Sequence, residues 1–268
     1  MIRAAVLGSP ISHSLSPILH RTAYEHLGVA GQYQAIEVTS ENLAEFIANL
    51  GDTWTGFSLT MPLKEKILSI AADVDPLAKR IKSANTLVRI AGGWRALSTD
   101  VNGFTQSLAS AGVADFTRVT ILGSGATARA AAASCDGPGR QITVIHRSPE
   151  RELSMRETVI HAQLEFRDWG SDLEAGSVLI NTTPACVADI YSEKLEGLVG
   201  GIYFEALYQP WPSKLLSRWR ALSGFAIDGL DLLVHQGIDQ VEMFTGQKVL
   251  RAELAPVLRS ACLAAMKP

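Results

Sequence analysis

Residues 119–135 read V-T-I-L-G-S-G-A-T-A-R-A-A-A-A-S-C. The stretch predicts a short buried strand over 119–122, a glycine turn, and an alanine-rich helix from about Thr127. Where a strand stops on glycine and restarts as a helix, free backbone N–H groups and the positive end of the helix dipole meet at one place. Such a place suits a pyrophosphate. The stretch therefore favours a nucleotide-binding unit, with a strand–turn–helix that binds nothing as the alternative.

The turn itself supplies the first candidate cofactor residues. Gly123 permits the tight turn, and Gly125 lets a phosphate approach the backbone. The third glycine of the dinucleotide pattern is replaced by alanine, at Ala126 or Ala128, which is small enough for close helix–strand packing. The predicted contacts from this turn are Gly123, Ser124, Gly125, Ala126 and Thr127.

A second strand, 141–145, ends in His146-Arg147-Ser148. Arg147 follows the first glycine by 24 residues (147 − 123). An acidic residue near this place would bind the ribose 2′-hydroxyl of NAD, whereas arginine accommodates the 2′-phosphate of NADP. Arg147 and Arg151 would make charge-assisted bonds to that phosphate, and Ser148 would add a hydroxyl. We predict an NADP site here that includes His146; two ordinary surface arginines are the alternative.

Composition sets the broad class of protein. The chain has 268 residues, 47% apolar and 19% charged, which predicts one large or two medium globular domains. A net charge of -3 argues against nucleic acid as a partner. No apolar run suits a bilayer, and no signal peptide opens the chain, so a membrane is not expected. Three scattered cysteines without C-x-x-C indicate neither zinc nor disulfides, and a reducing cytoplasm fits.

The first strand, 2–7, leads into G-S-P-I-S-H-S-L-S-P over 8–17. Pro17 is expected to open a helix that reaches about Leu27. The hydroxyls of Ser14 and Ser16 would point the same way from an extended segment, and they suit a small carboxylate at the start of that helix. The alternative is that Ser16 is only the N-cap of the helix.

Strands at 33–38 and 54–60 flank a helix at 41–50, so this part predicts a parallel sheet. The third strand continues as S-L-T-M-P-L-K over 58–64. Pro62 fixes a turn and places Lys64 at the start of the next helix. The positive helix end there would depress the lysine pKa toward a catalytic range. The alternative is a solvated helix lysine, as Lys66 is.

A hairpin follows, with strands at 87–90 and 94–97 around Gly92-Gly93. Asp100 comes directly after it. This aspartate either N-caps the helix expected over 101–111 or serves as the acid–base partner of Lys64.

The remaining elements complete a second alternating β/α region. One strand ends in N-T-T-P over 181–184, at the sheet edge where a cofactor ribose and nicotinamide would lie, which adds Thr182 to the candidate contacts. His235 is interpreted as a packed side chain and not as a ligand. The strands are predicted at 164–168, 177–180, 202–207 and 226–228, and the helices at 149–161, 213–222, 230–244 and 255–266, with Pro256 in the first turn of the last helix.

Seven motifs together resemble the shikimate dehydrogenase family over essentially the whole chain. They are Gly8–Pro17, Ser58–Lys64, Ser83–Thr86 (S-A-N-T), Ser98–Gly103 (S-T-D-V-N-G), Gly123–Ala130, Asn181–Pro184 and Gly229–Gln236 (G-L-D-L-L-V-H-Q). The resemblance implies a two-domain α/β enzyme with a Rossmann-type NADP domain that reduces 3-dehydroshikimate to shikimate with NADPH and needs no metal.

The resemblance also implies roles for individual residues. Lys64 and Asp100 match the catalytic pair of the family, and Gly229 would approach the nicotinamide. The residues that match its substrate contacts are Ser14, Ser16, Thr60, Asn85 and Gln236, with Tyr208 nearby. The implied substrate domain is discontinuous, over 1–103 and 236–268, and the NADP domain covers 104–235.

The chain departs from the common family pattern without losing a proposed catalytic group. Ser58 and Ser98 stand where asparagine is usual, and Glu205 stands where aspartate is frequent. His146 and Ser148 replace an asparagine and a threonine. Extra space or a different hydroxyl near Ser16 and Thr60 would admit quinate, so a quinate dehydrogenase of the same family is an alternative. Its use of NAD is a further alternative, against which Arg147 argues. A non-catalytic NADP sensor is a further alternative, against which the retained Lys64 and Asp100 argue. Monomer and homodimer are both compatible with the sequence.

Overall fold

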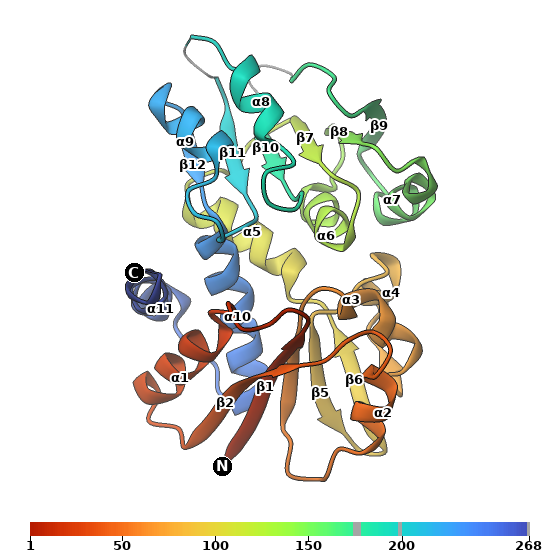
Figure 1. The fold of residues 1–268 in the computed structure, drawn as a ribbon, viewed down its shortest axis with the longest axis vertical. Helices are drawn as coiled ribbons and strands as arrows, with labels where there is room; N and C mark the ends of the chain where they lie inside the picture. Colours follow the sequence, from red (N-terminus) through yellow and green to blue (C-terminus); the bar gives the residue numbers. More distant parts are fainter. Residues whose placement is uncertain (174–177, 198–199, 267–268) are drawn as a thin grey trace. The chain divides into compact units, whose positions relative to one another are not determined.

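The computed structural model describes residues 1–173, 178–197 and 200–266. The chain forms two compact units (Figure 1). The first comprises Met1–Gly103 and the chain from Leu233 onward, and the second comprises Phe104–Leu232. The chain leaves the first unit within α5 (Asp100–Ser110) and returns to it within α10 (Gly229–Thr245). Each unit is built on a six-stranded sheet.

The sheet of the first unit has the strand order β2-β1-β3-β5-β6-β4. β1 is parallel to β2 and β3, as the sequence predicted, whereas β5 is antiparallel to both β3 and β6. The predicted hairpin is therefore confirmed, and it turns a parallel sheet into a mixed one. The strands are β1 (Ile2–Gly8), β2 (Gly31–Glu37), β3 (Gly56–Leu59), β4 (Asp73–Val74), β5 (Thr86–Ile90) and β6 (Gly93–Leu97).

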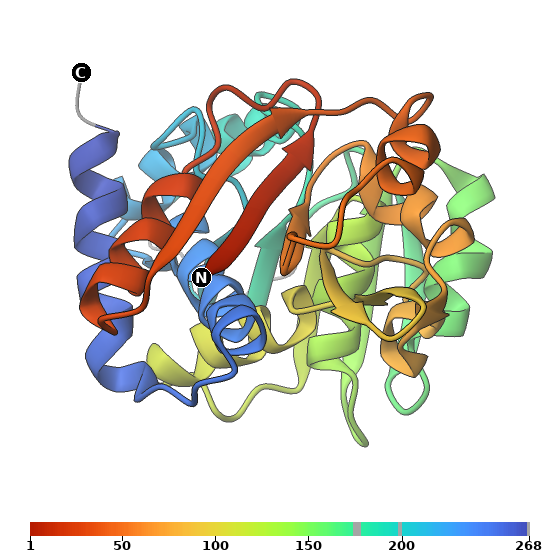
Figure 2. The ribbon, with the colours of Figure 1, turned by 90° about the horizontal axis from the view of Figure 1, so that it is seen from below.

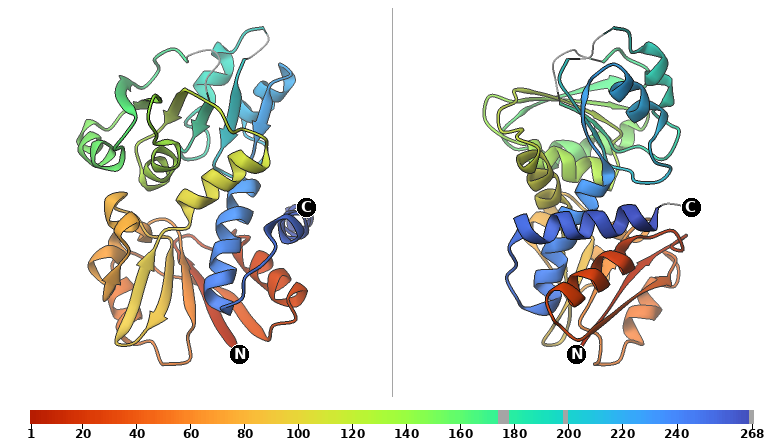
Figure 3. Two further views of the ribbon diagram at one scale, coloured as in Figure 1. Left: turned by 180° about the vertical axis from the view of Figure 1, so that it is seen from behind. Right: turned by 90° about the vertical axis from the view of Figure 1, so that its left-hand side faces the viewer.

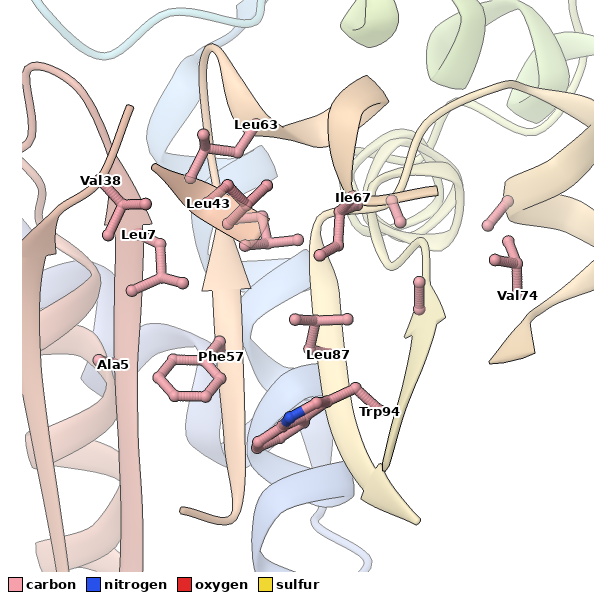
Figure 4. Close-up of a cluster of buried hydrophobic side chains, with 14 of the residues drawn as sticks. Ala5, Leu7, Val38, Leu43, Phe57, Leu63, Ile67, Val74, Leu87 and Trp94 are labelled. Carbon is pink, nitrogen blue, oxygen red and sulfur yellow. The ribbon is translucent and has the colours of Figure 1, made fainter. Parts of the chain in front are cut away.

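β1 is buried on both faces of this sheet because its residues alternate between two apolar clusters. Ala5 and Leu7 pack with Phe57, Leu87 and Trp94 on one face (Figure 4). Ile2, Ala4 and Val6 belong to the opposite cluster, together with Tyr24, Tyr33 and Phe244. This double burial explains the nearly continuous apolar run of residues 2–7.

Two helices that are far apart in the sequence, α1 (Ser16–His26) and α11 (Arg251–Ala265), lie side by side in the first unit (Figures 2 and 3). The predicted start of the last helix, Ala255, is wrong. The backbone N–H of Leu254 already donates to the carbonyl of Leu250, so the helix begins a turn earlier. Pro256 consequently lies inside the helix and not in its first turn. The other helices here are α2 (Leu43–Ala48), α3 (Leu63–Lys66), the 3-10 helix η1 (Ile67–Ser69) and α4 (Pro76–Arg80).

The sheet of the second unit is parallel throughout, in the order β12-β11-β10-β7-β8-β9. β7 lies between β10 and β8, so the strand order reverses beside it, and ligands of such sheets bind at this switch point. The strands are β7 (Arg118–Leu122), β8 (Gln141–His146), β9 (Gln163–Asp168), β10 (Val178–Asn181), β11 (Ile202–Glu205) and β12 (Phe225–Ile227). Ser177, the predicted start of β10, lies outside the described residues.

The helix predicted over 149–161 is shorter than expected. It consists of the 3-10 helix η2 (Pro149–Arg151) and α7 (Glu152–Thr158). The carboxylate of Asp136 accepts hydrogen bonds from the backbone N–H groups of Ile160, His161 and Ala162, at 2.8–2.9 Å. These bonds hold the chain out of the helix and lead it into β9. The other helices are α6 (Ala126–Cys135), α8 (Asp189–Lys194) and α9 (Lys214–Ala221).

Candidate active site

Three loops of the first unit meet at the carboxyl ends of β1 and β3. The backbone N–H of Ser9, after β1, donates to the carbonyl of Met61, after β3, at 3.1 Å. The carbonyl of Lys64 in turn accepts from the N–H of Ala84, just before β5, at 2.8 Å. The segments that carry the predicted serines, Lys64 and Asn85 are thereby neighbours.

Lys64 and Asp100 form an ion pair at this edge. The Nζ of Lys64 lies 2.7 Å from Oδ2 of Asp100, and the two side chains are 17% and 7% exposed. α3 has only four residues, so its dipole is small and the carboxylate is the main electrostatic partner of the ammonium group. An ammonium group has three N–H donors, and one bond to Asp100 leaves donors for a substrate oxygen.

Asn85 and Gln236 complete this polar cluster. The Nδ2 of Asn85 donates to Oδ1 of Asp100 at 2.8 Å and lies 3.1 Å from Oε1 of Gln236. Thr99 bonds to the other end of the amide, through its backbone N–H to Oδ1 of Asn85 at 2.8 Å. All four side chains are buried. Both carboxylate oxygens of Asp100 are thus bonded, one to Lys64 and one to Asn85.

The serine segment differs from the expected conformation. Residues 11–14 form a turn, closed by a bond from the N–H of Ser14 to the carbonyl of Ile11, and not an extended run. The N-cap of α1 is Leu15, so the alternative that Ser16 is the cap is wrong. Ser14 does part of the capping instead, because its Oγ accepts from the N–H of Ser16 at 3.3 Å. Ser16 is buried, and Ser14 and Thr60 are half-buried.

In the second unit, the turn after β7 has a backbone conformation that favours glycine. Gly123 has φ +104°, and a Cβ there would lie 2.9 Å from Oγ1 of Thr182. That hydroxyl donates to the carbonyl of Leu122 at 2.7 Å, so the N-T-T-P loop lies directly against the turn. Gly125 is the extended N-cap residue of α6, whose first N–H groups follow it.

Arg151, one of the two arginines predicted for the 2′-phosphate, lies beside this turn. A Cβ on Gly125 would lie 3.3 Å from Nη1 of Arg151. Arg147 is exposed and lines a cavity of about 540 Å³, together with Pro149, Glu152 and Arg167. Positive charge, glycine turn and helix N-terminus therefore occur together, as an anionic dinucleotide needs.

His146 lines the same cavity as Arg147 and also supports the backbone that follows it. It is 6% exposed, its Nδ1 accepts from the N–H of Ser148 at 3.2 Å, and its Nε2 lies 3.5 Å from Oε1 of Glu152. The ring thus fixes the backbone of Ser148, whose side chain is half-buried.

Gly229 lies where its backbone must approach another segment closely. A Cβ there would lie 2.2 Å from the carbonyl oxygen of Leu207 and 2.7 Å from the nitrogen of Tyr208. Any larger residue would displace the segment that carries Tyr208. Tyr208 itself is half-buried and belongs to the second unit, so its substrate contact stays a prediction.

Glu205, noted in the sequence only as a departure from the family pattern, joins several segments at the carboxyl ends of the strands in the second unit. Its carboxylate accepts from Tyr203 Oη at 2.5 Å, from Ser213 Oγ at 2.7 Å and from Asn181 Nδ2 at 3.1 Å. Burial raises the pKa of Glu205, against the lowering effect of these bonds. The residue ties the N-T-T-P loop to the end of β11 and to the start of α9.

His20 lies in the core of the first unit. Its ring stacks on Tyr33 with centroids 4.0 Å apart, and its Nε2 bonds to Oε1 of Gln240 at 3.3 Å. Burial lowers the pKa of His20 to about 3, against a smaller raising effect of Gln240. The predicted packing role of His235 is also seen: it is buried, and burial together with Arg251 lowers its pKa to about 4.

The low pKa of His20 predicts acid sensitivity. Below pH 6.5, His20 binds a proton in the unfolded chain but stays neutral in the folded protein. The contribution of the neutral His20 to the free energy of unfolding is therefore complete above that pH, and it is lost as the pH falls toward 3. Between pH 6.5 and 5 the loss is about 2 kcal/mol. Between pH 6.5 and 5, the free energy of unfolding measured in urea should fall by about 2 kcal/mol more in wild type than in His20→Phe. Equal drops in the two proteins would contradict the neutral, buried His20.

Some groups that support the site were not predicted. Thr86, Thr99 and Gln240 bond to Asn85, and Glu205 organises the second unit. Only Gln240 has a local signal, because it follows Gln236 by one helical turn and shares its face.

A lysine–carboxylate pair in one α/β unit and a glycine turn flanked by arginines in the other define a nucleotide-dependent oxidoreductase. Residues 6–87 match the family model described as the shikimate dehydrogenase substrate binding domain. The shikimate dehydrogenase (NADP(+)) of Methanosarcina mazei is 36% identical over 258 residues, covering 90% of this chain and 91% of the relative. That of Thermosynechococcus vestitus is 34% identical over 270 residues and covers 96% and 94%. The chain belongs to the shikimate dehydrogenase family.

Solved structures of shikimate dehydrogenases are also similar to this chain. The Mycobacterium tuberculosis shikimate dehydrogenase has a TM-score of 0.87 at 34% identity, covering 97% of this chain and all (100%) of the other. The Thermus thermophilus enzyme, solved with NADP(H) and shikimate, has a TM-score of 0.83 at 29% identity, with coverage of 97% and 100%.

None of the helices in the described ranges is long and apolar enough to cross a membrane. Within those ranges there is also no group of three or more His, Cys, Asp or Glu side chains that could hold a metal ion.

Proposed function

We propose that the protein catalyses the reversible, NADPH-dependent reduction of 3-dehydroshikimate to shikimate, a step toward aromatic amino acids. The observation that carries the proposal is the Lys64–Asp100 pair, bonded to Asn85 and placed beside Gln236, in a chain whose close relatives bear this activity in their names. A quinate dehydrogenase or an NADP sensor are the alternatives to be tested against it.

Proton transfer is the part of the reaction that this chain supplies. NADPH, when bound, provides the hydride for the C3 carbonyl carbon. Lys64, as an ammonium, donates a hydrogen bond and then a proton to the carbonyl oxygen, which becomes the hydroxyl. Asp100 pairs with the ammonium group at 2.7 Å and orients it.

Substrate orientation is assigned to a set of polar side chains, most of them in the first unit. Hydroxyls suit the ring carboxylate and hydroxyl groups, and the amides of Asn85 and Gln236 add a donor and an acceptor in fixed places. The residues proposed for this role are Ser14, Ser16, Thr60, Asn85, Gln236 and Tyr208.

The geometry of the glycine turn supports a proposal that the second unit binds NADP. The glycine turn leaves space that a Cβ would fill, and Arg151 lies against it. Arg147, Ser148 and Arg151 would hold the 2′-phosphate. Backbone and side chains at Ser124, Ala126 and Thr127 would hold the pyrophosphate, and Thr182 and Gly229 would face the ribose and nicotinamide.

We assign substrate binding to residues 1–103 and 236–268 and cofactor binding to 104–235. The compact units divide within α10 at Leu232 and Leu233, three residues earlier than this assignment. A cytoplasmic location is part of the proposal, because Cys135, Cys186 and Cys262, all in described segments, are free thiols.

The test is nicotinamide reduction by the purified protein, with shikimate and quinate each offered with NADP and NAD. The proposal predicts rapid reduction for shikimate with NADP and little in the other three combinations. Quinate with NAD as the best pair would overturn the assignment of both sites. No reaction in any combination, from protein that still binds NADP, would favour the sensor.

A further inference from the structure

We propose that Gln240 and Thr86 are positioning residues for this reaction: they hold the amide of Asn85 toward Asp100 and so keep the Lys64–Asp100 pair aligned. The inference rests on the proposed function and adds a hydrogen-bonded support behind the catalytic pair. All of its members belong to the first unit.

Gln240 is the centre of this support. Its side chain is 1% exposed, and its amide is fully bonded. Nε2 donates to the carbonyl of Asn85 at 3.1 Å and to Oγ1 of Thr86 at 2.9 Å. Oε1 accepts from Oγ of Ser58 at 2.7 Å and from Nε2 of His20 at 3.3 Å. Because the Asn85 carbonyl can only accept, the NH₂ group of Gln240 must face it, and only this orientation of the amide satisfies all four bonds.

Thr86 transmits that orientation to Asn85. The amide nitrogen of Gln240 can only donate, so the Thr86 hydroxyl accepts from it and gives its own hydrogen to Oδ1 of Asn85, at 2.9 Å. With Oδ1 held by Thr86 and by the N–H of Thr99, Nδ2 must face Asp100, where it donates at 2.8 Å. Every donor in the series points toward the carboxylate, an arrangement that strengthens successive bonds.

The support is anchored in three further elements of the unit. Ser58 on β3 also accepts from the hydroxyl of Tyr33 on β2, at 2.5 Å. His20 on α1 stacks on the Tyr33 ring and bonds to Gln240. All three side chains are buried, so the position of Gln240 is set by packed neighbours and not by solvent. Ser58, which stands where the family commonly has asparagine, faces this support.

The test removes single hydrogen bonds at nearly constant volume. Thr86→Val keeps the shape and loses the hydroxyl, and Gln240→Met loses both donors. We expect kcat for 3-dehydroshikimate reduction to fall about tenfold in each, since small misplacements of a catalytic group are costly, with KM for NADPH unchanged. Thr86→Ser restores the hydroxyl and should recover most of the rate.

A matched control separates positioning from loss of a buried hydroxyl. Thr120 on β7 is 1% exposed, and its Oγ1 has no hydrogen-bond partner in the described residues. Thr120→Val makes the same chemical change in the second unit, and should keep wild-type kcat and KM.

A double-mutant cycle gives the decisive result. In an Asn85→Ala background no amide remains to be oriented, so adding Thr86→Val should change kcat less than about twofold. A full, additive tenfold loss in that background would show a general structural effect and overturn the inference. If the wild-type enzyme is active and both Thr86→Val and Gln240→Met keep its kcat, the inference is overturned while the proposed function stands. A wild type that does not reduce 3-dehydroshikimate would overturn the proposed function and this inference together.

Discussion

Replacing Lys64 by methionine should lower kcat for 3-dehydroshikimate reduction by about a thousandfold, while KM for substrate and cofactor changes little. The substitution removes both the proton donor and the charge that stabilises the developing alkoxide, effects worth about 10²- to 10⁴-fold in similar sites. Methionine retains the length of the stem, so packing around the half-buried side chain is preserved. Steady-state kinetics of NADPH oxidation measure the effect.

Lys66 provides the matched control for this prediction. It lies on the same short helix, two residues on, and is exposed. Lys66→Met should retain wild-type turnover. Near-wild-type turnover in Lys64→Met would remove Lys64 from the proposed mechanism, whatever the behaviour of Lys66.

The second large effect is expected in cofactor affinity. Removing both arginines, as Arg147→Ala with Arg151→Ala, should raise KM for NADPH by about a hundredfold, since each charge-assisted bond to the 2′-phosphate contributes about 1.5 kcal/mol. KM for NADH should stay within about threefold, because that cofactor lacks the 2′-phosphate. The preference for NADPH would then nearly disappear, with kcat at saturation preserved.

Arg218→Ala is a suitable control for that experiment. Arg218 is exposed on α9 of the same unit, where it bonds to the carbonyl of Leu195, away from the glycine turn. It should leave both KM values unchanged. An equal rise of KM for NADPH and NADH in the double variant would mean that the arginines do not distinguish the cofactors.

Most strands and helices of each unit could be predicted from the sequence because their signals are local, whereas the division into two units was implied by the family motifs. β7 and the turn at Gly123 could be inferred from adjacent residues, and the hairpin from its glycines. The end of α7 could not, because it depends on the carboxylate of Asp136, 24 residues before Ile160. The turn at Ser14 and the early start of α11 likewise depend on backbone bonds that no periodicity encodes.

The same distinction applies to the site. Lys64 and Asp100 could be singled out by their places beside Pro62 and before a helix, and the family motifs supported them. Gln240 reaches Thr86 across 154 residues, and such a contact has no local pattern. The conformational role of Glu205 was hidden for the same reason: its bond to Asn181 spans 24 residues and joins two different strands.

Hydride and proton transfer can be followed together by NMR, when 3-dehydroshikimate is reduced with a stoichiometric amount of NADPH deuterated at the transferred position of C4. Wild type is expected to form shikimate that carries deuterium at C3, and Lys64→Met should not form it at a comparable rate. Bound NADPH that stays unoxidised in the presence of the ketone, or deuterium at any other carbon, would contradict the proposed mechanism.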